Sequence, residues 1–177
     1  MTAAVVRAMA LDDCERVSEV RIRGWQSAYR GLMPQAYLDA LDVGEDAERR
    51  RAWFTQGDGT VRNLVAERDG RVVGWAAYGP YRDGEVRTDD GELYAIYVDP
   101  EHHGEGLGRA LLEASLRGCA AEGRRLARLW VLKENSPARR FYERAGFHAD
   151  GAEEPFEVDG IEVPELRYTK VVELPVP

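Results

Sequence analysis

The chain has 177 residues, a formal net charge of -8 and a hydrophobic fraction of 44%. This length suits one domain with a sizeable core, and the composition is that of a globular protein and not of a disordered one. The acidic balance argues against a nucleic-acid binder, which normally presents a basic face, and no apolar run reaches the ~18 residues of a membrane span.

Two isolated cysteines, Cys14 and Cys119, give neither a disulfide framework nor the spacing of a metal site. A reducing compartment is then the default, and the N-terminal MTAAVVRAM has no long apolar run. The sequence therefore predicts one cytoplasmic domain over residues 1–177, with no metal ion and with neither nucleic acid nor membrane as a partner.

The N-terminal part of the chain reads as a short strand followed by helices. Asp12 and Glu15 have the spacing of a capping box, which predicts a helix start beside them. Pro34 suits the first residue of a second, short helix. The predicted elements are a strand over Ala3–Met9, a helix to about Arg30, a helix from Pro34 to Leu41 and a helix over Glu45–Phe54.

The middle of the chain reads as a hairpin and a further strand. Asp69-Gly70 suits the tight primed turn of a hairpin, here between Val61–Glu67 and Arg71–Tyr78. The polar segment Tyr81–Gly91 is expected to be a connection. Glu92–Val98 (ELYAIYV) is rich in β-branched and aromatic residues and predicts a strand.

The remaining pattern alternates helices and strands. The predicted elements are a helix over Gly106–Glu122, a strand over Leu126–Leu132, a helix from Ser136 to Gly146, and strands within Phe147–Val158 and Glu165–Val172. This order predicts a mixed α+β domain with one layered sheet.

The stretch HGEGLG, from His103 to Gly108, places glycine at every second position between a predicted strand and a predicted helix. Glycine inside a regular element costs ~0.5–1 kcal/mol relative to alanine, so a compensating role is expected. N–H groups at a helix start point outward, and glycine lets a phosphate approach them. A plain tight turn is the alternative, but three alternating glycines in this context favour the phosphate site.

Two common nucleotide motifs fit this stretch poorly. A dinucleotide fold requires G-x-G-x-x-G after an early strand, whereas the spacing here is G-x-G-x-G after a later one. A P-loop ends in Gly-Lys followed by Ser or Thr, whereas Gly108 precedes Arg109. A nucleotide-dependent enzyme is therefore disfavoured.

Two ordered segments resemble the motifs of the GNAT superfamily of N-acetyltransferases. Ile96–Glu113 (IYVDPEHHGEGLGRALLE) is similar to the acetyl-coenzyme A motif, in which a strand and V-x-P precede a glycine-rich turn that opens a helix. Asn135–Phe147 (NSPARRFYERAGF) is similar to the motif that follows, N-x-x-A-x-x-x-Y-x-x-x-G-F. Arg23–Pro34 (RGWQSAYRGLMP) also resembles one branch of the family. The resemblance covers nearly the whole chain, but His103 stands where the family usually has Gln or Arg.

The resemblance implies a three-layer α/β/α fold of the α+β class. Its sheet would be mixed, mostly antiparallel, of about seven strands, splayed between the fourth and fifth, with about four flanking helices. It also implies acetyl-CoA as co-substrate, whose pantetheine amides would bind the backbone of Ile96, Tyr97 and Val98 as an added strand would. The diphosphate would lie on backbone N–H groups of His103, Gly104, Glu105, Gly106, Leu107, Gly108 and Arg109, with Leu107 facing the core.

Tyr142 and Glu92 are the expected catalytic residues. By resemblance, Tyr142 would protonate the departing thiolate, although a core aromatic beside Phe141 is the alternative. Glu92 would take the proton of an alkylammonium directly or through water, from the strand face that it shares with Tyr94, Ile96 and Val98. A solvated charge at the strand end is the alternative for Glu92, and Glu67 and Glu134 are weaker candidates for the base.

Asn135 would contact the coenzyme, although Asn-Ser-Pro is also a good helix start. In the ribosomal-protein branch of the family a catalytic carboxylate stands where this chain has Trp130, so that branch's base does not transfer.

The predicted function is transfer of acetyl from acetyl-CoA to a primary amine by direct attack in a ternary complex. The acceptor would be a small-molecule amine or a protein N-terminus, and the acidic balance leans toward cationic amines. The alternative is a non-catalytic sensor of the same fold that binds acyl-CoA without turnover. Because dimers are common in the family, a homodimer is a further expectation.

Overall fold

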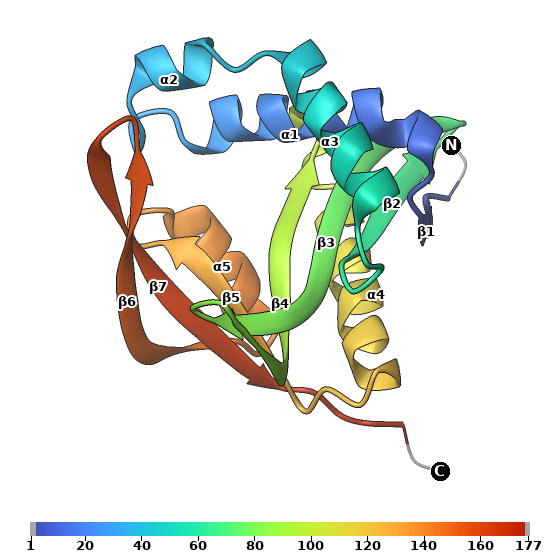
Figure 1. The fold of residues 1–177 in the computed structure, drawn as a ribbon, viewed down its shortest axis with the longest axis vertical. Coiled ribbons are helices and arrows are strands. Elements are labelled where there is room, and N and C mark those ends of the chain that lie inside the picture. Colours follow the sequence, from blue (N-terminus) through green and yellow to red (C-terminus); the bar gives the residue numbers. More distant parts are fainter. Residues whose placement is uncertain (1–2, 176–177) are drawn as a thin grey trace.

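The computed structural model describes residues 3–175, in which seven strands form one sheet in the order β1-β2-β3-β4-β5-β7-β6 (Figure 1). The strands are β1 Val5–Ala8, β2 Arg62–Arg68, β3 Arg71–Asp83, β4 Val86–Val98, β5 Leu126–Leu132, β6 His148–Val158 and β7 Ile161–Val171. The helices are α1 Cys14–Ala28, α2 Gln35–Asp39, α3 Val43–Gln56, α4 Leu107–Ala121 and α5 Ser136–Arg144, with short 3-10 turns at Leu11–Asp13 and Pro100–His102. Of the predicted domain 1–177, residues 1–2 and 176–177 lie outside the described part.

Every strand pairing is antiparallel except that of β4 with β5, which is parallel. The expected mixed, mostly antiparallel sheet is therefore confirmed. Among residues 3–175 the sheet carries five α-helices, where about four were expected.

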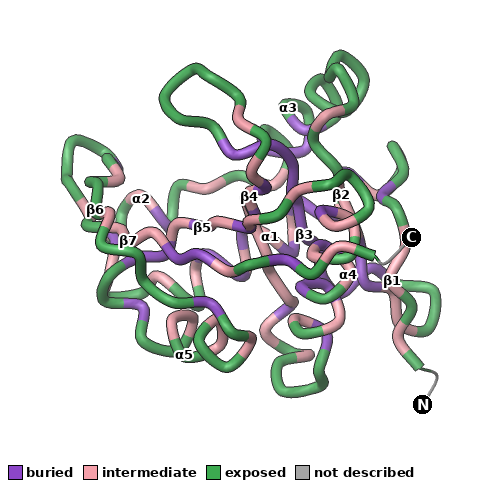
Figure 2. The backbone as a smooth tube through the Cα atoms, turned by 90° about the horizontal axis from the view of Figure 1, so that it is seen from below, coloured by how far each residue is buried: buried purple, intermediate pink, exposed green. Residues whose placement is uncertain are grey.

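The helices form a layer on each face of the sheet. On one face α1 packs so closely that a Cβ on Gly24 would lie 3.0 Å from the Tyr97 ring, and α2 and α3 share this face. On the other face α4 packs on β3, where a Cβ on Gly74 would lie 3.0 Å from Leu111. Figure 2 shows that β3, between these layers, is buried over most of its length.

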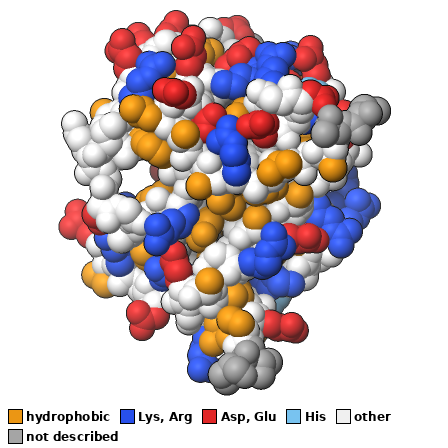
Figure 3. Space-filling model, turned by 90° about the vertical axis from the view of Figure 1, so that its right-hand side faces the viewer, with side chains coloured by type: hydrophobic (Ala, Val, Ile, Leu, Met, Phe, Trp, Pro, Cys, Tyr) orange, Lys and Arg blue, Asp and Glu red, His pale blue; other side chains and the backbone are white. Residues whose placement is uncertain are grey.

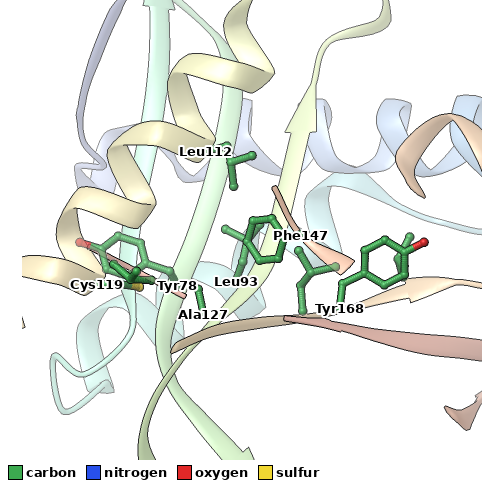
Figure 4. Packing of buried hydrophobic residues seen from close by; sticks show 10 residues of the cluster. Tyr78, Leu93, Leu112, Cys119, Ala127, Phe147 and Tyr168 are labelled. Atoms are coloured by element: carbon green, nitrogen blue, oxygen red, sulfur yellow. The ribbon is translucent and has the colours of Figure 1, made fainter. Parts of the chain in front are cut away.

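The largest part of the core lies between the sheet and the helices α4 and α5 (Figure 4). Leu112, Phe147 and Tyr168 meet there, together with Tyr78 of β3. The ring of Tyr78 reaches the backbone of α4 at Gly118, where a Cβ would overlap its hydroxyl. On the face shown in Figure 3, acidic and basic side chains are interspersed with small apolar patches.

The hairpin between β2 and β3 turns at Asp69-Gly70, with φ of 50° and 77°, as the primed-turn pattern predicts. The expectation of a connection over Tyr81–Gly91 is wrong. β3 runs on to Asp83 and β4 begins at Val86, because a turn at Gly84 extends the pair beyond the core. Residues 82–87 of this extension are exposed, whereas Tyr81 and Gly91 at its ends are buried, so its polarity reflects exposure and not a lack of regular structure.

The capping box predicted at Asp12 and Glu15 is also wrong. A 3-10 turn precedes α1, and the Asp13 carboxylate accepts the Ala10 N–H at 2.7 Å. Asp13 also pairs with Arg7 of β1, which links the helix start to the sheet.

A bulge in β4 changes which side chains share a face. Ala77 of β3 pairs with Ala95, but the next residue, Tyr78, pairs with Leu93, so Tyr94 is an extra residue in the ladder. Glu92 and Tyr94 therefore face the α1 side, whereas Ile96 packs on the α4 side. The expectation that Glu92 shares a face with Ile96 and Val98 is wrong for this reason.

Candidate functional site

The two central parallel strands separate soon after they meet. β4 and β5 pair only at Gly91–Ala127 and Glu92–Arg128, and Figure 1 shows them diverging from that end. The remainder of β4, Leu93–Val98, has no strand partner on this side. The predicted splay is thus present, and it leaves backbone N–H and C=O groups available to an extended ligand.

A cavity of about 180 Å³ fills the gap between the two strands. It is lined by Gly24 and Ala28 of α1 and by Tyr29, which caps the C-terminal end of that helix. The other lining residues are Leu93–Val98 of β4, Trp130–Leu132 of β5, and His103, Asn135, Ala138, Tyr142 and Glu165. The helix α1 covers one face of the sheet and α5 covers the other. Residues from both helix layers therefore line the cavity.

The glycine-rich turn lies between the end of β4 and the start of α4. Gly104 and Gly106 have φ of 81° and 80°, a left-handed conformation that favours glycine, and a Cβ on either would meet nothing within 4 Å. Gly108 has ordinary helical geometry, and its added Cβ would make a normal contact with Phe141 at 3.5 Å. Two of the three glycines are therefore required by the turn itself.

The backbone N–H groups of residues 104–109 have no hydrogen-bond acceptor within the described chain. They belong to an exposed turn and to the first turn of α4, where the partial positive charge of the helix gathers. The Leu107 side chain is buried in the core, as expected. The turn is thus an open set of donors of the kind that binds phosphate.

The charged side chains of the turn pair with neighbouring residues. Glu105 pairs with Arg68 of β2 and lies 3.3 Å from the His102 ring, so its negative charge is compensated. The Arg109 side chain is 80% exposed and pairs with Glu113 one turn along α4, a weak surface ion pair. His103 bonds through Nε2 to the Val98 carbonyl at 3.1 Å, at the open end of β4.

A buried carboxylate, Asp99, holds the base of the turn. Its Oδ2 accepts hydrogen bonds from Arg16 at 2.6 Å and Arg23 at 2.9 Å, and its Oδ1 accepts the Glu101 N–H at 3.2 Å. Burial favours the neutral acid, but the bond from Arg16 and the two positive charges prevail, so the pKa of Asp99 lies below its usual range. The turn is therefore fixed to α1 before any ligand arrives.

Tyr142 and Asn135 bring α5 to the cavity. The Tyr142 ring packs edge-on against Phe141 and Phe147, with centroids 5.1 and 5.9 Å apart, and its hydroxyl has no hydrogen-bond partner in residues 3–175. Burial raises the pKa of Tyr142, so the phenol stays protonated. The Asn135 carbonyl oxygen caps α5 by accepting the Ala138 N–H at 3.3 Å, which leaves its NH₂ group for a ligand.

The carboxylate that lines the cavity is Glu165, not Glu92. Burial raises the pKa of Glu165 to about 7, and the negative charge of Glu154 adds to the shift. Burial also raises the pKa of Glu92 to about 7, against a hydrogen bond from the Arg82 backbone. Glu92 lies on the same sheet face as the cavity's α1 wall but outside the lining. In the described residues none of Glu92, Glu154 and Glu165 forms an ion pair.

Two tyrosines from different layers meet in the cavity wall. The hydroxyls of Tyr29, at the C-terminal end of α1, and Tyr97 in β4 lie 2.9 Å apart. Burial raises the pKa of both phenols. The Tyr97 ring stacks on Trp75, with centroids 6.2 Å apart, and Arg50 covers the far face of Trp75 at 4.3 Å.

Sequence reasoning missed Glu165 and gave Tyr29 no role. β7 inserts between β5 and β6, which places Glu165 opposite Leu132. The chain order contains no signal for this insertion. The Tyr29–Tyr97 contact likewise depends on how α1 crosses the sheet, which no spacing in the sequence reports.

The described residues contain no group of three or more His, Cys, Asp or Glu side chains arranged to hold a metal ion. Over the same part of the chain, none of the helices has the length and apolarity needed to cross a bilayer.

These features place an open strand edge beside a turn of unpartnered N–H groups, an arrangement that suits an extended ligand with an anionic end. The sequence pattern of the acetyltransferase (GNAT) family matches residues 25–147, and the chain belongs to that family.

Three similar proteins illustrate the relationship. An uncharacterised N-acetyltransferase of Bacillus subtilis strain 168, YuaI, is 31% identical over 91% of this chain and 89% of its own length. A mycothiol acetyltransferase of Amycolatopsis mediterranei is 42% identical over 64% of this chain, which spans 36% of that protein. The PaiA N-acetyltransferase of Thermoplasma acidophilum, solved with coenzyme A, has a TM-score of 0.73 at 21% identity, over 96% of this chain and 99% of its own. This last likeness establishes the shared fold.

Proposed function

We propose that the protein transfers the acetyl group of acetyl-CoA to a primary amine. The observation that carries the proposal is one cavity that joins three features. The unpartnered N–H groups of the turn lie at one end of the open β4 edge, the free Tyr142 hydroxyl lines the cavity, and Glu165 faces it from β7.

The residues present fit acetyl-CoA. The N–H groups of residues 104–109 would bind the diphosphate, and Asn135 with the edge of Ile96, Tyr97 and Val98 would bind the pantetheine amides. Backbone N–H groups of the same edge would stabilise the oxyanion. The Val98 carbonyl, which the His103 Nε2 atom contacts at 3.1 Å, has a second lone pair with which it would accept a pantetheine amide.

The side chains around the cavity support general acid–base catalysis. Glu165, with a pKa of about 7, accepts a proton from the alkylammonium so that the free amine can attack. Tyr142, kept neutral by burial, donates a proton to the leaving thiolate. Burial raises the pKa of Glu92 to about 7 as well, and the negative charges of Glu154 and Glu165 add to this shift, so Glu92 is a second carboxylate of matched pKa.

Attack is direct because no thiol is placed to carry the acyl group. Cys14 and Cys119 are both buried in the core, and neither lines the cavity.

The excess of acidic residues in the hairpin that carries Glu165 favours a cationic acceptor. Acids outnumber bases in the hairpin of β6 and β7, whose acidic residues are Asp150, Glu153, Glu154, Glu157, Asp159, Glu162 and Glu165. Trp130 adds an aromatic face to the cavity. Small amines and protein N-termini both satisfy this chemistry.

The decisive experiment is a screen of primary amines with acetyl-CoA, following thiol release and the mass of the product. We expect acetylation of at least one amine, and Tyr142→Phe should lower its turnover by ~10²-fold or more while coenzyme A still binds. If wild type binds coenzyme A but acetylates no amine, the protein is a sensor of acyl-CoA and not an enzyme.

A further inference from the structure

The hydroxyls of Tyr29 and Tyr97 form a hydrogen-bonded pair in the wall of the cavity proposed for the transfer. Both tyrosines line the cavity that Tyr142 and Glu165 also line, and their oxygens are 2.9 Å apart. The pair is built from two layers, since Tyr29 comes from the C-terminal end of α1 and Tyr97 from β4. Gly24 allows this approach, because a Cβ there would lie 3.0 Å from the Tyr97 ring.

The surroundings fix both rings. Tyr29 packs edge-on against Trp25, with centroids 5.0 Å apart, and Tyr97 stacks on Trp75 at 6.2 Å. Arg50, buried between α3 and the sheet and bonded to Asp46, covers the other face of Trp75. A pair supported this firmly keeps its hydroxyls in place without a ligand.

Tyr142 alone cannot end the reaction in its starting state. If Tyr142 gives its proton to the thiolate, it becomes a phenolate in a buried site, and burial raises the pKa of Tyr142, Tyr29 and Tyr97 alike. Tyr97 lines the same cavity as Tyr142 and contributes to the raised pKa of Tyr142, as Glu165 contributes to that of Tyr29. A path that returns a proton to Tyr142 in the same step avoids this charge.

We propose that Tyr29 and Tyr97 relay a proton from the acceptor nitrogen to Tyr142, as further catalytic residues of the transfer. This inference rests on the proposed function. After attack, the nitrogen of the tetrahedral intermediate carries a positive charge. Its proton passes to the Tyr29 oxygen while the Tyr29 proton passes to Tyr97.

The Tyr97 proton then passes to Tyr142, and the Tyr142 proton passes to sulfur as the carbon–sulfur bond breaks. Nitrogen loses one proton, sulfur gains one, and each tyrosine ends neutral. The first proton of the ammonium has already gone to Glu165 and leaves to solvent. The cavity of about 180 Å³ has room for water molecules beside these hydroxyls, since one water needs only ~10–15 Å³ of accessible space.

The test compares Tyr29→Phe, Tyr97→Phe and the double variant, using the amine that wild type acetylates best. Phenylalanine keeps the ring packing and removes only the hydroxyl. Tyr37→Phe is the matched control, because Tyr37 packs on Trp25 in the same aromatic cluster but does not line the cavity. Coenzyme A affinity and thermal unfolding are measured for every variant.

We expect each single variant to lower kcat by at least ~10-fold, within the range for positioned proton transfer, with coenzyme A affinity within twofold of wild type. Because the two hydroxyls act in series, the double variant should be no slower than the slower single variant. A plot of kcat against the deuterium fraction of the solvent should be curved for wild type and linear for Tyr29→Phe.

The relay would be refuted if Tyr29→Phe had the same kcat as wild type. It would also be refuted if the two single-variant losses of kcat multiplied in the double variant while the solvent isotope effect stayed as in wild type. If Tyr97→Phe does not fold, Tyr29→Phe still decides the question, since its ring lies at the cavity wall. Failure of wild type to acetylate any amine refutes the proposed function, whereas active wild type with unaffected variants refutes the relay alone.

Discussion

Replacing Gly106 with alanine tests the phosphate site most directly. Gly106 has a φ of 80° and its added Cβ would point into open space beside the unpartnered N–H groups. An L-residue in this left-handed conformation costs ~1–2 kcal/mol of stability. If the methyl group also prevents one N–H from reaching phosphate, a charge-assisted hydrogen bond of ~1.5–3 kcal/mol is lost. Coenzyme A affinity should then fall on the order of 10- to 150-fold.

Gly59→Ala separates backbone strain from ligand binding. Gly59 has a φ of 77°, an added Cβ there also meets nothing within 4 Å, and it lies in the connection from α3 to β2. Both substitutions should lower the Tm of thermal unfolding by a similar amount. Only Gly106→Ala should also weaken the binding of coenzyme A in calorimetric titration. Equal affinity in the two variants would refute the assignment of the turn as the diphosphate site.

Two further predictions concern buried carboxylates. Wild-type kcat should rise with pH through about 7, because Glu165 must be ionised to accept a proton, and Glu165→Gln should lack this rise while Glu92→Gln keeps it. Because folding raises the pKa of Glu165, the folded protein loses stability as pH rises from about 4.5 to about 7 and Glu165 ionises. At pH 8, Glu165→Gln should therefore unfold at a higher temperature than wild type. A lower unfolding temperature for Glu165→Gln would contradict the burial argument. Asp99→Asn should destabilise the protein at pH 7 by less than the ~3–5 kcal/mol of a fully buried pair, because Arg16 and Arg23 reach solvent. Since folding lowers the pKa of Asp99, the two denaturant midpoints should converge as pH falls below the usual range of Asp, and a constant gap would refute this linkage.

The sequence predicts the order of elements because local signals punctuate it well. Asp69-Gly70 marks a turn with positive φ, and Pro137 with the Asn135 cap marks the start of α5. The error at Tyr81–Gly91 arose because polarity was taken to mean loop. A strand pair that projects beyond the core is polar on both faces, so its hydrophobic pattern disappears while its backbone pairing remains.

The site was predictable where it is local in sequence. The turn from His103 to Arg109 is a continuous segment, and its geometry follows from its glycines. Which acid–base side chains reach the cavity depends instead on how strands that are distant in sequence pair in the sheet. One extra residue at Tyr94 reverses the face of Glu92 relative to Ile96, and the insertion of β7 beside β5 brings Glu165 to the cavity.

The short contact between β4 and β5 has a consequence for the lifetime of the protein. Only Gly91–Ala127 and Glu92–Arg128 join the two halves of the sheet, so a ligand lying along Leu93–Val98 would serve as the missing strand. At a concentration ~100 times its dissociation constant such a ligand adds ~2.7 kcal/mol to folding stability. If acetyl-CoA is that ligand, as proposed, the β4 edge is uncovered when coenzyme A is scarce and is then a template for pairing with other chains. Cellular abundance of the protein would in that case follow the supply of the proposed co-substrate.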